Sequence, residues 1–175
     1  MKSVCIIGKG AGWSLAPPIF EAECWGITQL NLRRPVSRVI DMNDYSLWGD
    51  QEAAEAKESR RLAQDNGIPY IDLDEYPLER IIDAFRTDYF NSTVDYAIAL
   101  AIYEDYEKID FYGVNMANLT EYAYQKPGVE FWIGIAKGRG IEVNVHGSMS
   151  SILKTRDGLL YGYGIKQKGN LWLSD

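Results

Sequence analysis

The sequence predicts an α/β domain built on a mostly parallel, doubly wound sheet of about six strands. Three observations support this class. Six short apolar stretches alternate with segments of helical spacing, which is the pattern of strands joined by crossover helices. The first apolar stretch runs directly into closely spaced glycines, as a central parallel strand does before a helix. The chain has 175 residues and no internal repeat or linker, so we expect one domain over residues 1–175.

The opening segment Ser3–Ser14 is the clearest sign of a binding site. Its apolar run Val4–Ile7 leads into a loop that carries Gly8, Gly10 and Gly12. Backbone amides of such a loop can face a phosphate group, so the pattern predicts a Rossmann-like domain with a nucleotide-sized pocket beside the loop. We expect these amides to be free to contact an anion.

The glycine loop departs from two well-known phosphate-binding patterns. Trp13 stands where the third glycine of a dinucleotide fingerprint belongs, and Gln29, Leu30 and Asn31 replace the acidic residue that would bind a ribose. Lys9 lies between the glycines rather than after the last one, so the Walker pattern also fails. Three interpretations stay open: a looser Rossmann-like site for a phosphate-bearing ligand, an NAD(P)-dependent oxidoreductase, or a tight turn that binds nothing.

The other strands and helices follow in alternation. After the first loop, Pro17 and Pro18 allow only a short helix. Buried strands are expected at Cys24–Thr28, Arg38–Met42, Pro69–Leu73, Lys108–Val114 and Ile141–Val145. Helices are expected at Gln51–Asn66, Pro77–Phe85, Val94–Tyr106 and Gly128–Gly138. The alternating aromatic residues of segment 158–175 predict a C-terminal β-hairpin tail that covers a sheet edge or a partner surface.

Two of the expected helices differ in composition. The helix at Gln51–Asn66 is mostly polar with a thin apolar stripe, which is typical of a solvated outer helix, so its run of charges needs no functional explanation. The helix at Val94–Tyr106 is rich in small and apolar residues and is expected to be buried against the sheet. Ser92 and Thr93 precede it and serve either as helix caps or as ligands for a phosphate.

Composition limits the partners of this chain. Its net charge of −7 argues against binding to nucleic acid or to an anionic membrane, since both would repel an acidic protein. Cys5 and Cys24 fit buried thiols in a reducing compartment, and the chain has no membrane-spanning run or signal peptide, so we expect a cytoplasmic protein. His146 is the only histidine and the cysteines are not clustered, so neither a metal site nor a cofactor is expected.

Loops at the carboxyl ends of parallel strands meet at one edge of a sheet, so polar residues from distant segments are expected to form one pocket there. Arg33 and Arg34 are either a phosphate clamp or plain surface charges. Tyr122 and Tyr124, with Glu121 and Gln125, offer rings for a nucleobase and polar groups for a ribose, or else aromatic core packing. The expected ligand-binding residues are Lys9, Gly10, Gly12, Trp13, Ser14, Asn31, Arg33, Ser92, Thr93, Asn115, Met116, Glu121, Tyr122, Gln125, His146 and Ser148.

An enzymatic alternative depends on a different set of titratable residues. Asp41, Asp44 and Glu121 would be the acid/base candidates, with His146 as their partner. A lone histidine after a strand is also commonly a hydrogen-bonded polar residue with no catalytic role. The sequence contains no nucleophile elbow and no Ser–His–Asp order that would indicate a hydrolase triad.

Several stretches of the chain resemble one group of proteins. They read IIGKGAGWSLAP with WGITQLNLRRP, then YFNSTVDYAIALAIYEDY, IDFYGVNM and EYAYQKPGVEFWIGIAKGRGIEV. These stretches resemble small Rossmann-like proteins of bacteriophage genomes, which are distantly similar to a glycosyltransferase-like family with archaeal pterin pyrophosphokinases and sialyltransferase-type enzymes. The resemblance extends to about Ser150 and implies a phage origin and a nucleotide-type ligand. It assigns no chemistry, and the chain is shorter than those enzymes, without their acceptor domain.

These observations favour a binding protein that captures a nucleotide-derived small molecule. The phage resemblance makes an ADP-ribose-type or cyclic-nucleotide immune signal of the host the expected ligand, sequestered by a homo-oligomer in the cytoplasm of the infected bacterium. One alternative is an enzyme, either a nucleotide-sugar-dependent transferase or a hydrolase that degrades such a signal. Another is a phage assembly protein whose C-terminal aromatic residues bind a second chain.

Overall fold

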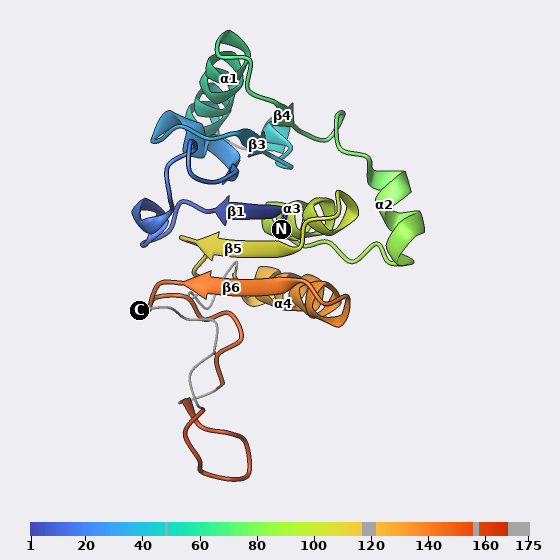
Figure 1. The fold of residues 1–175 in the computed structure, drawn as a ribbon. Helices are drawn as coiled ribbons and strands as arrows, with labels where there is room; N and C mark the ends of the chain where they lie inside the picture. The colour runs from blue at the N-terminus through green and yellow to red at the C-terminus, as the bar shows by residue number, and fades with distance from the viewer. Residues whose placement is uncertain (48, 117–121, 156–157, 168–175) are drawn as a thin grey trace.

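The computed structural model describes residues 1–47, 49–116, 122–155 and 158–167. One six-stranded sheet has the order β4-β3-β2-β1-β5-β6, and every neighbouring pair of strands is parallel (Figure 1). The strands are β1 (Ser3–Ile7), β2 (Cys24–Ile27), β3 (Arg38–Ile40), β4 (Tyr70–Ile71), β5 (Lys108–Tyr112) and β6 (Glu142–His146). The predicted α/β class with about six parallel strands is confirmed.

The central strands form where the sequence supplies short apolar runs. The residues of β2 and the run Val4–Ile7 of β1 are all buried, as expected for parallel strands that are covered on both faces. The register pairs Ile7 with Gly26 on one side and with Tyr112 on the other. The carboxyl ends of β1, β2 and β5 are therefore level, and the loops that follow them start at one edge of the sheet.

From β1 to β4 the connections run along one face of the sheet. They contain the 3-10 turns η1 (Trp13–Leu15), η2 (Thr28–Leu32) and η3 (Tyr45–Leu47), and the helix α1 (Asp50–Asp65). Ala16, Leu30 and Ala63 from these connections pack with Cys5 and Ile7 in one buried cluster. The first two connections form only 3-10 turns, and Pro17 and Pro18 limit helix formation in the first, in line with the short helix expected after the glycine loop.

After β4 the chain crosses to the other side of β1 and uses the opposite face. The helices on that face are α2 (Leu78–Phe85), α3 (Thr93–Tyr103) and α4 (Tyr122–Gly138). Ile98 and Trp132 from these helices pack with Ile6 and Phe111 in the larger buried cluster. Helices thus cover both faces, and the direction of winding reverses between β1 and β5. Such a switch point opens a crevice at the carboxyl edge of the sheet.

The helix α4 begins earlier than the sequence indicated. The prediction started this helix at Gly128, directly after Pro127, where the helical spacing of apolar residues resumes. The helix instead begins at Tyr122 and contains the proline. Contacts of α4 with α3 and β6 stabilise the whole helix and outweigh the loss of one hydrogen bond. No helix in the described ranges is both long and apolar enough to cross a membrane.

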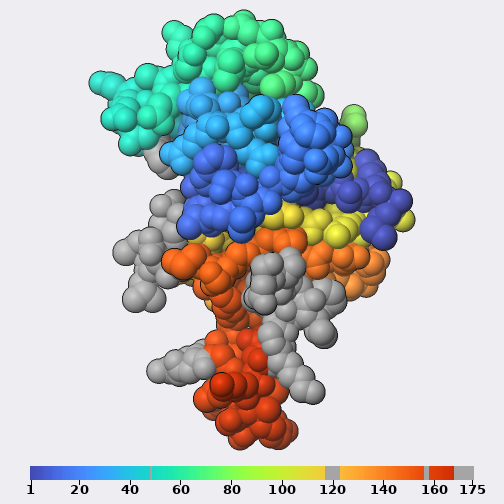
Figure 2. Space-filling model, turned by 60° about the vertical axis from the view of Figure 1, so that its left-hand side comes forward, coloured from blue at the N-terminus to red at the C-terminus, as the bar shows by residue number. Residues whose placement is uncertain are grey.

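The described part of the C-terminal tail, residues 158–167, projects away from the sheet (Figures 1 and 2). Leu159 and Lys166 form a single antiparallel bridge there. The side chains of Tyr161 and Tyr163 are 100% and 77% exposed, so they contribute nothing to the core. The predicted hairpin is short in these residues, and its remaining part, 168–175, lies outside the described ranges.

Candidate functional site

A cavity of about 710 Å³ opens at the carboxyl edge of the sheet, at the switch point between β1 and β5. Its wall comes from the loops after five strands, from the first two turns of α1 and from the N-terminal turns of α3 and α4. This volume is in the usual range for a small-molecule site. The lining residues are Gly8, Lys9, Gly10, Ile27, Thr28, Gln29, Met42, Asn43, Tyr45, Glu52, Glu55, Asn91, Ser92, Thr93, Val94, Tyr96, Gly113, Val114, Asn115, Met116, Gln125 and Met149.

The glycine loop packs tightly against the loop that follows β5. The amides of Gly8 and Gly10 donate to the carbonyl oxygens of Tyr112 and Gly113, at 2.8 and 2.9 Å. A Cβ atom at Gly8 or Gly10 would lie 2.6 or 2.7 Å from the Gly113 oxygen, which no side chain tolerates. The expectation that the loop amides are free is therefore wrong for Gly8 and Gly10. These glycines are needed because two backbone segments approach each other closely.

Lys9 brings a positive charge into the cavity wall. Its Nζ donates a hydrogen bond to Gln29 Oε1 at 2.8 Å. The residue as a whole is exposed, but its ammonium group is partly enclosed, so burial lowers the pKa of Lys9, and the nearby Arg33 guanidinium lowers it further. The charges of Asp41 and Glu55 act in the opposite direction. Arg33 is exposed and does not line the cavity, so it acts on this site through its charge.

Two residues of the wall other than glycine hold left-handed backbone conformations. Thr28 and Met116 have φ angles of 56° and 49°, a region that is costly for a β-branched residue such as threonine. The hydroxyl oxygen of Thr28 is buried and has no hydrogen-bond partner among the described residues. Buried polar groups normally have a partner, so this hydroxyl is an exception among the described residues. Thr28 was absent from the predicted ligand-binding residues, because nothing in the sequence indicates the strained turn that follows β2.

The first turn of α3 contributes Ser92 and Thr93. Ser92 is the N-cap: its hydroxyl accepts from the Asp95 amide at 3.3 Å and donates to Asp95 Oδ1 at 2.9 Å. Asp95 Oδ2 in turn accepts from the amides of Asn91 and Ser92, at 2.6 and 3.1 Å. The capping role of Ser92 is thus confirmed, and the same residue lines the cavity with Thr93. The positive end of the α3 dipole lies at the cavity wall.

Of the predicted ligand-binding residues, the cavity brings together Lys9, Gly10, Ser92, Thr93, Asn115, Met116 and Gln125. The structure places Gly12, Trp13 and Ser14 outside it, and Trp13 and Ser14 line a second, smaller cavity of about 340 Å³ with Arg34. Arg34 donates to the backbone oxygens of Trp13, Ala16 and Pro17 at 3.2, 3.3 and 2.6 Å. Arg34 therefore holds the turn after the glycine loop, where it is not a clamp for a phosphate.

Two further predicted residues are engaged elsewhere. The Asn31 amide nitrogen donates to the Ser59 backbone oxygen at 2.7 Å, and the Ser59 hydroxyl donates back at 2.5 Å, so Asn31 ties η2 to α1. The ring of His146 is stacked on Tyr112 with centroids 4.3 Å apart, and its Nε2 lies 2.9 Å from Asp110 Oδ1. Both residues lie outside the cavity lining.

The aromatic cluster expected to hold a nucleobase is described only in part. Glu121 and the side chain of Tyr122 lie outside the described residues. Tyr124 is 79% exposed and does not line the cavity, whereas Gln125 does. Ser148, expected at the same edge, is exposed and also lies outside the lining.

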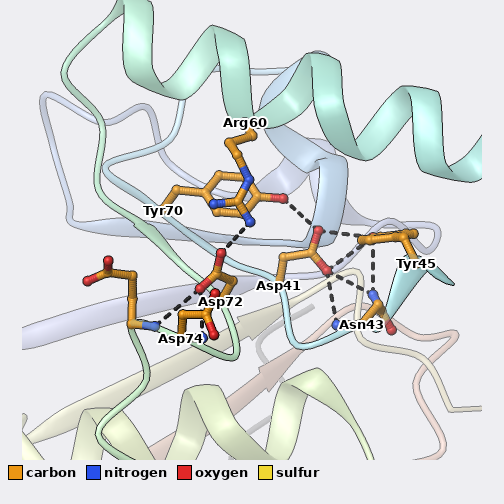
Figure 3. A network of polar contacts seen from close by, with 8 residues as sticks. Asp41, Asn43, Tyr45, Arg60, Tyr70, Asp72 and Asp74 are labelled. Atoms are coloured by element: carbon orange, nitrogen blue, oxygen red, sulfur yellow. Dashed lines mark hydrogen bonds and ion pairs between the residues drawn. The ribbon is translucent and has the colours of Figure 1, made fainter.

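The acid/base candidates of the enzymatic alternative do not line the cavity where the structure describes them. Asp41 is 2% exposed and accepts hydrogen bonds from Tyr45 and Tyr70, behind the cavity wall (Figure 3). Asp44 is exposed, and its hydrogen bonds from Ser46 lower the pKa of its carboxyl.

Carboxylates at the cavity come instead from α1. Glu52 and Glu55, one turn apart on this helix, both line the cavity. Both residues are exposed, as the sequence predicted for the solvated face of this helix, and they also border the cavity. The thin apolar stripe of α1 correctly indicated an outer helix, but periodicity does not show that one polar edge of the helix meets a cavity. Within the described residues, no three His, Cys, Asp or Glu side chains converge in a way that could hold a metal ion.

No protein-family model matches this sequence, and no curated protein matches it. Solved structures with a similar arrangement include a probable thiamine pyrophosphokinase from Staphylococcus saprophyticus, with TM-score 0.42 and 14% identity over 83% of this chain and 64% of that chain. The sialyltransferase CstII from Campylobacter jejuni, in complex with the substrate analogue CMP-3FNeuAc, gives TM-score 0.37 and 15% identity over 83% of this chain and 81% of that chain. The sialyltransferase CST-II in complex with a trisaccharide acceptor and CMP gives 0.41 and 14%, over 82% and 80%.

These structures include a probable thiamine pyrophosphokinase and sialyltransferases, at low identity and with TM-scores below 0.5, which is consistent with the distant similarity that the sequence suggested. The likeness extends no further than the general arrangement of strands and helices. This chain spans 64% of the length of the pyrophosphokinase chain.

Proposed function

We propose that the cavity at the switch point binds a nucleotide-derived small molecule, with the anionic part of the ligand near Lys9 and the first turn of α3. The observation that carries this proposal is the position of the Lys9 ammonium, which Gln29 holds in the wall of a cavity of ligand size. The protein as a whole carries a net charge of −7, so an anion is attracted here by local charge only.

Three further features support an anionic ligand with an apolar portion. Arg33 adds a second positive charge close enough to lower the pKa of Lys9. The buried Thr28 hydroxyl offers a hydrogen bond that no described residue uses. The side chains of Met42 and Met116 add apolar, polarisable surface to the wall, which suits a flat ring.

We propose further that the protein holds this ligand without converting it. Of the acid/base candidates, Asp41, Asp44 and His146 lie outside the lining, and the described lining contains no histidine. Capture of an ADP-ribose-type or cyclic-nucleotide immune signal in the cytoplasm of an infected bacterium is the finer form of this proposal. It rests on the sequence resemblance to phage proteins, as does the expected homo-oligomer.

One observation favours a second function. Glu52 and Glu55 place two carboxylates at the cavity, where they could act as general acid or base on a bound nucleotide derivative. A transferase or hydrolase that acts on such a ligand is therefore the alternative, and it uses the same cavity.

Native mass spectrometry and calorimetry test the proposal with ADP, ADP-ribose, CMP and a cyclic dinucleotide as probes. We expect one probe to bind and to be recovered unaltered after denaturation. Lys9→Ala should lower its affinity by about tenfold, the effect of removing one charge-assisted hydrogen bond. Lys57→Ala is the matched control, because Lys57 is exposed on α1 outside the cavity and carries the same charge.

Three outcomes would contradict this function. If none of the four probes binds, the cavity is not a nucleotide site. If both lysine variants weaken binding equally, the ligand lies elsewhere. If a probe is converted by the wild type and not by Glu52→Gln or Glu55→Gln, the enzymatic alternative holds.

A further inference from the structure

The Lys9 ammonium is connected to a buried carboxylate by a chain of hydrogen bonds. Lys9 Nζ donates to Gln29 Oε1 at 2.8 Å, and Gln29 Nε2 donates to the Tyr45 hydroxyl oxygen. The Tyr45 hydroxyl lies 2.9 Å from Asp41 Oδ2 and 3.1 Å from Oδ1. Two side chains, Gln29 and Tyr45, therefore link the cavity surface to Asp41, which is 2% exposed. Figure 3 shows the contact of Tyr45 with Asp41.

The charge of Asp41 fixes the direction of every hydrogen bond in this chain. A carboxylate only accepts, so the Tyr45 hydroxyl donates its single proton to Asp41, and its oxygen is left to accept. The Gln29 amide must then turn its NH₂ group toward Tyr45, which leaves its carbonyl oxygen facing Lys9. The opposite orientation of the amide would place NH₂ against the ammonium, donor against donor.

The environment of Asp41 keeps this arrangement in place. Asn43 Nδ2 donates to Asp41 Oδ1 at 2.9 Å, and the Tyr70 hydroxyl donates to Oδ2 at 2.7 Å. Burial, followed by the charge of Asp41, raises the pKa values of Tyr45 and Tyr70, so both phenols keep their protons at neutral pH. Tyr70 points to Asp41 from β4, while Tyr45 lines the cavity (Figure 3).

We propose that Asp41 is a positioning residue for ligand binding, which acts through Tyr45 and Gln29 to hold the Lys9 ammonium against the cavity wall. The proposal rests on the proposed function of the cavity as a site for an anionic ligand. Asp41 is an acid/base candidate by its sequence position, but its burial behind Tyr45 keeps it from touching a ligand. Its effect on binding would be to restrict Lys9 before the ligand arrives, which lowers the entropic cost of binding.

Tyr70 supplies a matched control for Tyr45. Both phenols donate to Asp41 Oδ2, at 2.7 and 2.9 Å, so Tyr→Phe at either position removes one hydrogen bond from the same carboxylate. Only Tyr45 also accepts from Gln29. If the role of Asp41 is purely structural, the two variants should change the reactivity of Lys9 to a similar extent. If Asp41 positions Lys9, only Tyr45→Phe should change it.

The first experiment needs no ligand. Whole protein is acylated with trace acetic anhydride, and peptide mass spectrometry gives the labelling rate of Lys9 relative to that of the exposed Lys57. We expect this ratio to change by about fivefold in Tyr45→Phe, the effect of losing one neutral hydrogen bond, that from Gln29 to Tyr45, and to stay at the wild-type value in Tyr70→Phe. An unchanged ratio in Tyr45→Phe, or equal changes in both variants, overturns the proposal.

Asp41→Asn tests the part of the proposal that concerns Asp41 itself, because Tyr45→Phe also removes the acceptor of Gln29 directly. It keeps the proposal testable, too, if Tyr45→Phe fails to fold. The asparagine amide of this variant can donate to the Tyr45 oxygen, so Tyr45 no longer has to accept its hydrogen bond from Gln29. We therefore expect the labelling rate of Lys9 relative to Lys57 to shift as it does in Tyr45→Phe. Affinity for ADP, measured by calorimetry, should fall by about fivefold in Tyr45→Phe and stay unchanged in Tyr70→Phe. If wild-type protein fails to bind ADP and the other nucleotide probes, the proposed function fails, while the labelling ratios still decide whether Asp41 positions Lys9.

Discussion

The backbone of Gly128 in α4 lies directly against the carboxylate of Asp95 in α3. A Cβ atom at position 128 would be 3.0 Å from Asp95 Cγ and still closer to Oδ2. The absence of a side chain at Gly128 lets the two helices pack closely and seals Asp95, which is 0% exposed, below the first turn of α3. The pairing of α3 with α4 and the wall of the cavity thus depend on the same contact.

Gly128→Ala is therefore expected to destabilise the protein by about 2 kcal/mol, because the methyl group must displace a buried carboxylate. Gly134→Ala, in the same helix, is the control. No atom lies within 4 Å of a Cβ at position 134, so alanine should raise the free energy of unfolding there by about 0.5–1 kcal/mol. Urea denaturation measures both. Similar effects of the two substitutions would show that the contact with Asp95 does not limit helix packing.

The same burial makes the stability of the protein depend on pH through Asp95. Burial raises the pKa of this carboxyl from 3.8 to about 6, although hydrogen bonds from Asn91 and Ser92 oppose the shift. The folded state therefore binds the Asp95 proton more tightly than the unfolded chain does. The resulting stability is fully present below pH 3.8 and is lost as pH rises through 6; the difference amounts to about 3 kcal/mol.

Asp95→Asn should abolish this dependence, because asparagine does not titrate. The free energy of unfolding is measured in urea for wild type and variant at several values between pH 4 and 7.5. We expect the difference between the two proteins to change by about 2.5 kcal/mol across this range, with the wild type relatively more stable at the acidic end. Other carboxyl groups titrate in both proteins and cancel in the difference. A difference that is constant with pH would mean that Asp95 ionises normally.

Thr28 lines the proposed binding site and has a strained backbone conformation. Its φ angle of 56° is unfavourable for a β-branched residue, and glycine adopts it without strain. Thr28→Gly should leave the free energy of unfolding unchanged or raise it by up to about 1 kcal/mol, because relief of strain offsets the greater freedom of the unfolded chain. The same variant removes the unpartnered hydroxyl and should weaken nucleotide binding about fivefold. Loss of stability together with unchanged binding would indicate that the hydroxyl is structural.

The sheet could be predicted from sequence because its strands are short apolar runs, and β1 with its glycine loop shows this best. The loop was recognised correctly, but its purpose was not. Gly8 and Gly10 are required by the close approach of Gly113, a contact across 100 residues of sequence that no local pattern encodes. The spacing of the glycines indicates that the loop after β1 must lack side chains. Only the tertiary structure shows whether a ligand or another backbone segment lies against it.

Cavity residues were predicted correctly where the sheet topology alone determines their position. They were missed where side-chain packing or local backbone strain determines it. Lys9, Ser92 and Asn115 follow strand ends or begin a helix, so the rule for parallel sheets brings them together. Thr28 and Glu55 were missed for different reasons. The strain of Thr28 arises from the turn after β2, and Glu55 reaches the cavity only because α1 starts beside it.

The adjacent arginines 33 and 34 are expected to have separable roles. Arg34 binds three backbone oxygens of the turn around η1, so Arg34→Ala should cost about 2 kcal/mol of stability, and Arg34→Lys should restore little of it because an ammonium lacks the planar array of donors. Arg33 is exposed and acts on Lys9 through charge, so Arg33→Ala should leave stability within about 0.5 kcal/mol of wild type. Its effect should fall on nucleotide affinity, with a loss of about twofold to threefold at low salt that disappears at high salt, since exposed charges are screened. Thermal unfolding and calorimetry at two salt concentrations separate these effects. Equal losses of stability in both alanine variants would refute the assignment, because only Arg34 is hydrogen-bonded to the turn around η1.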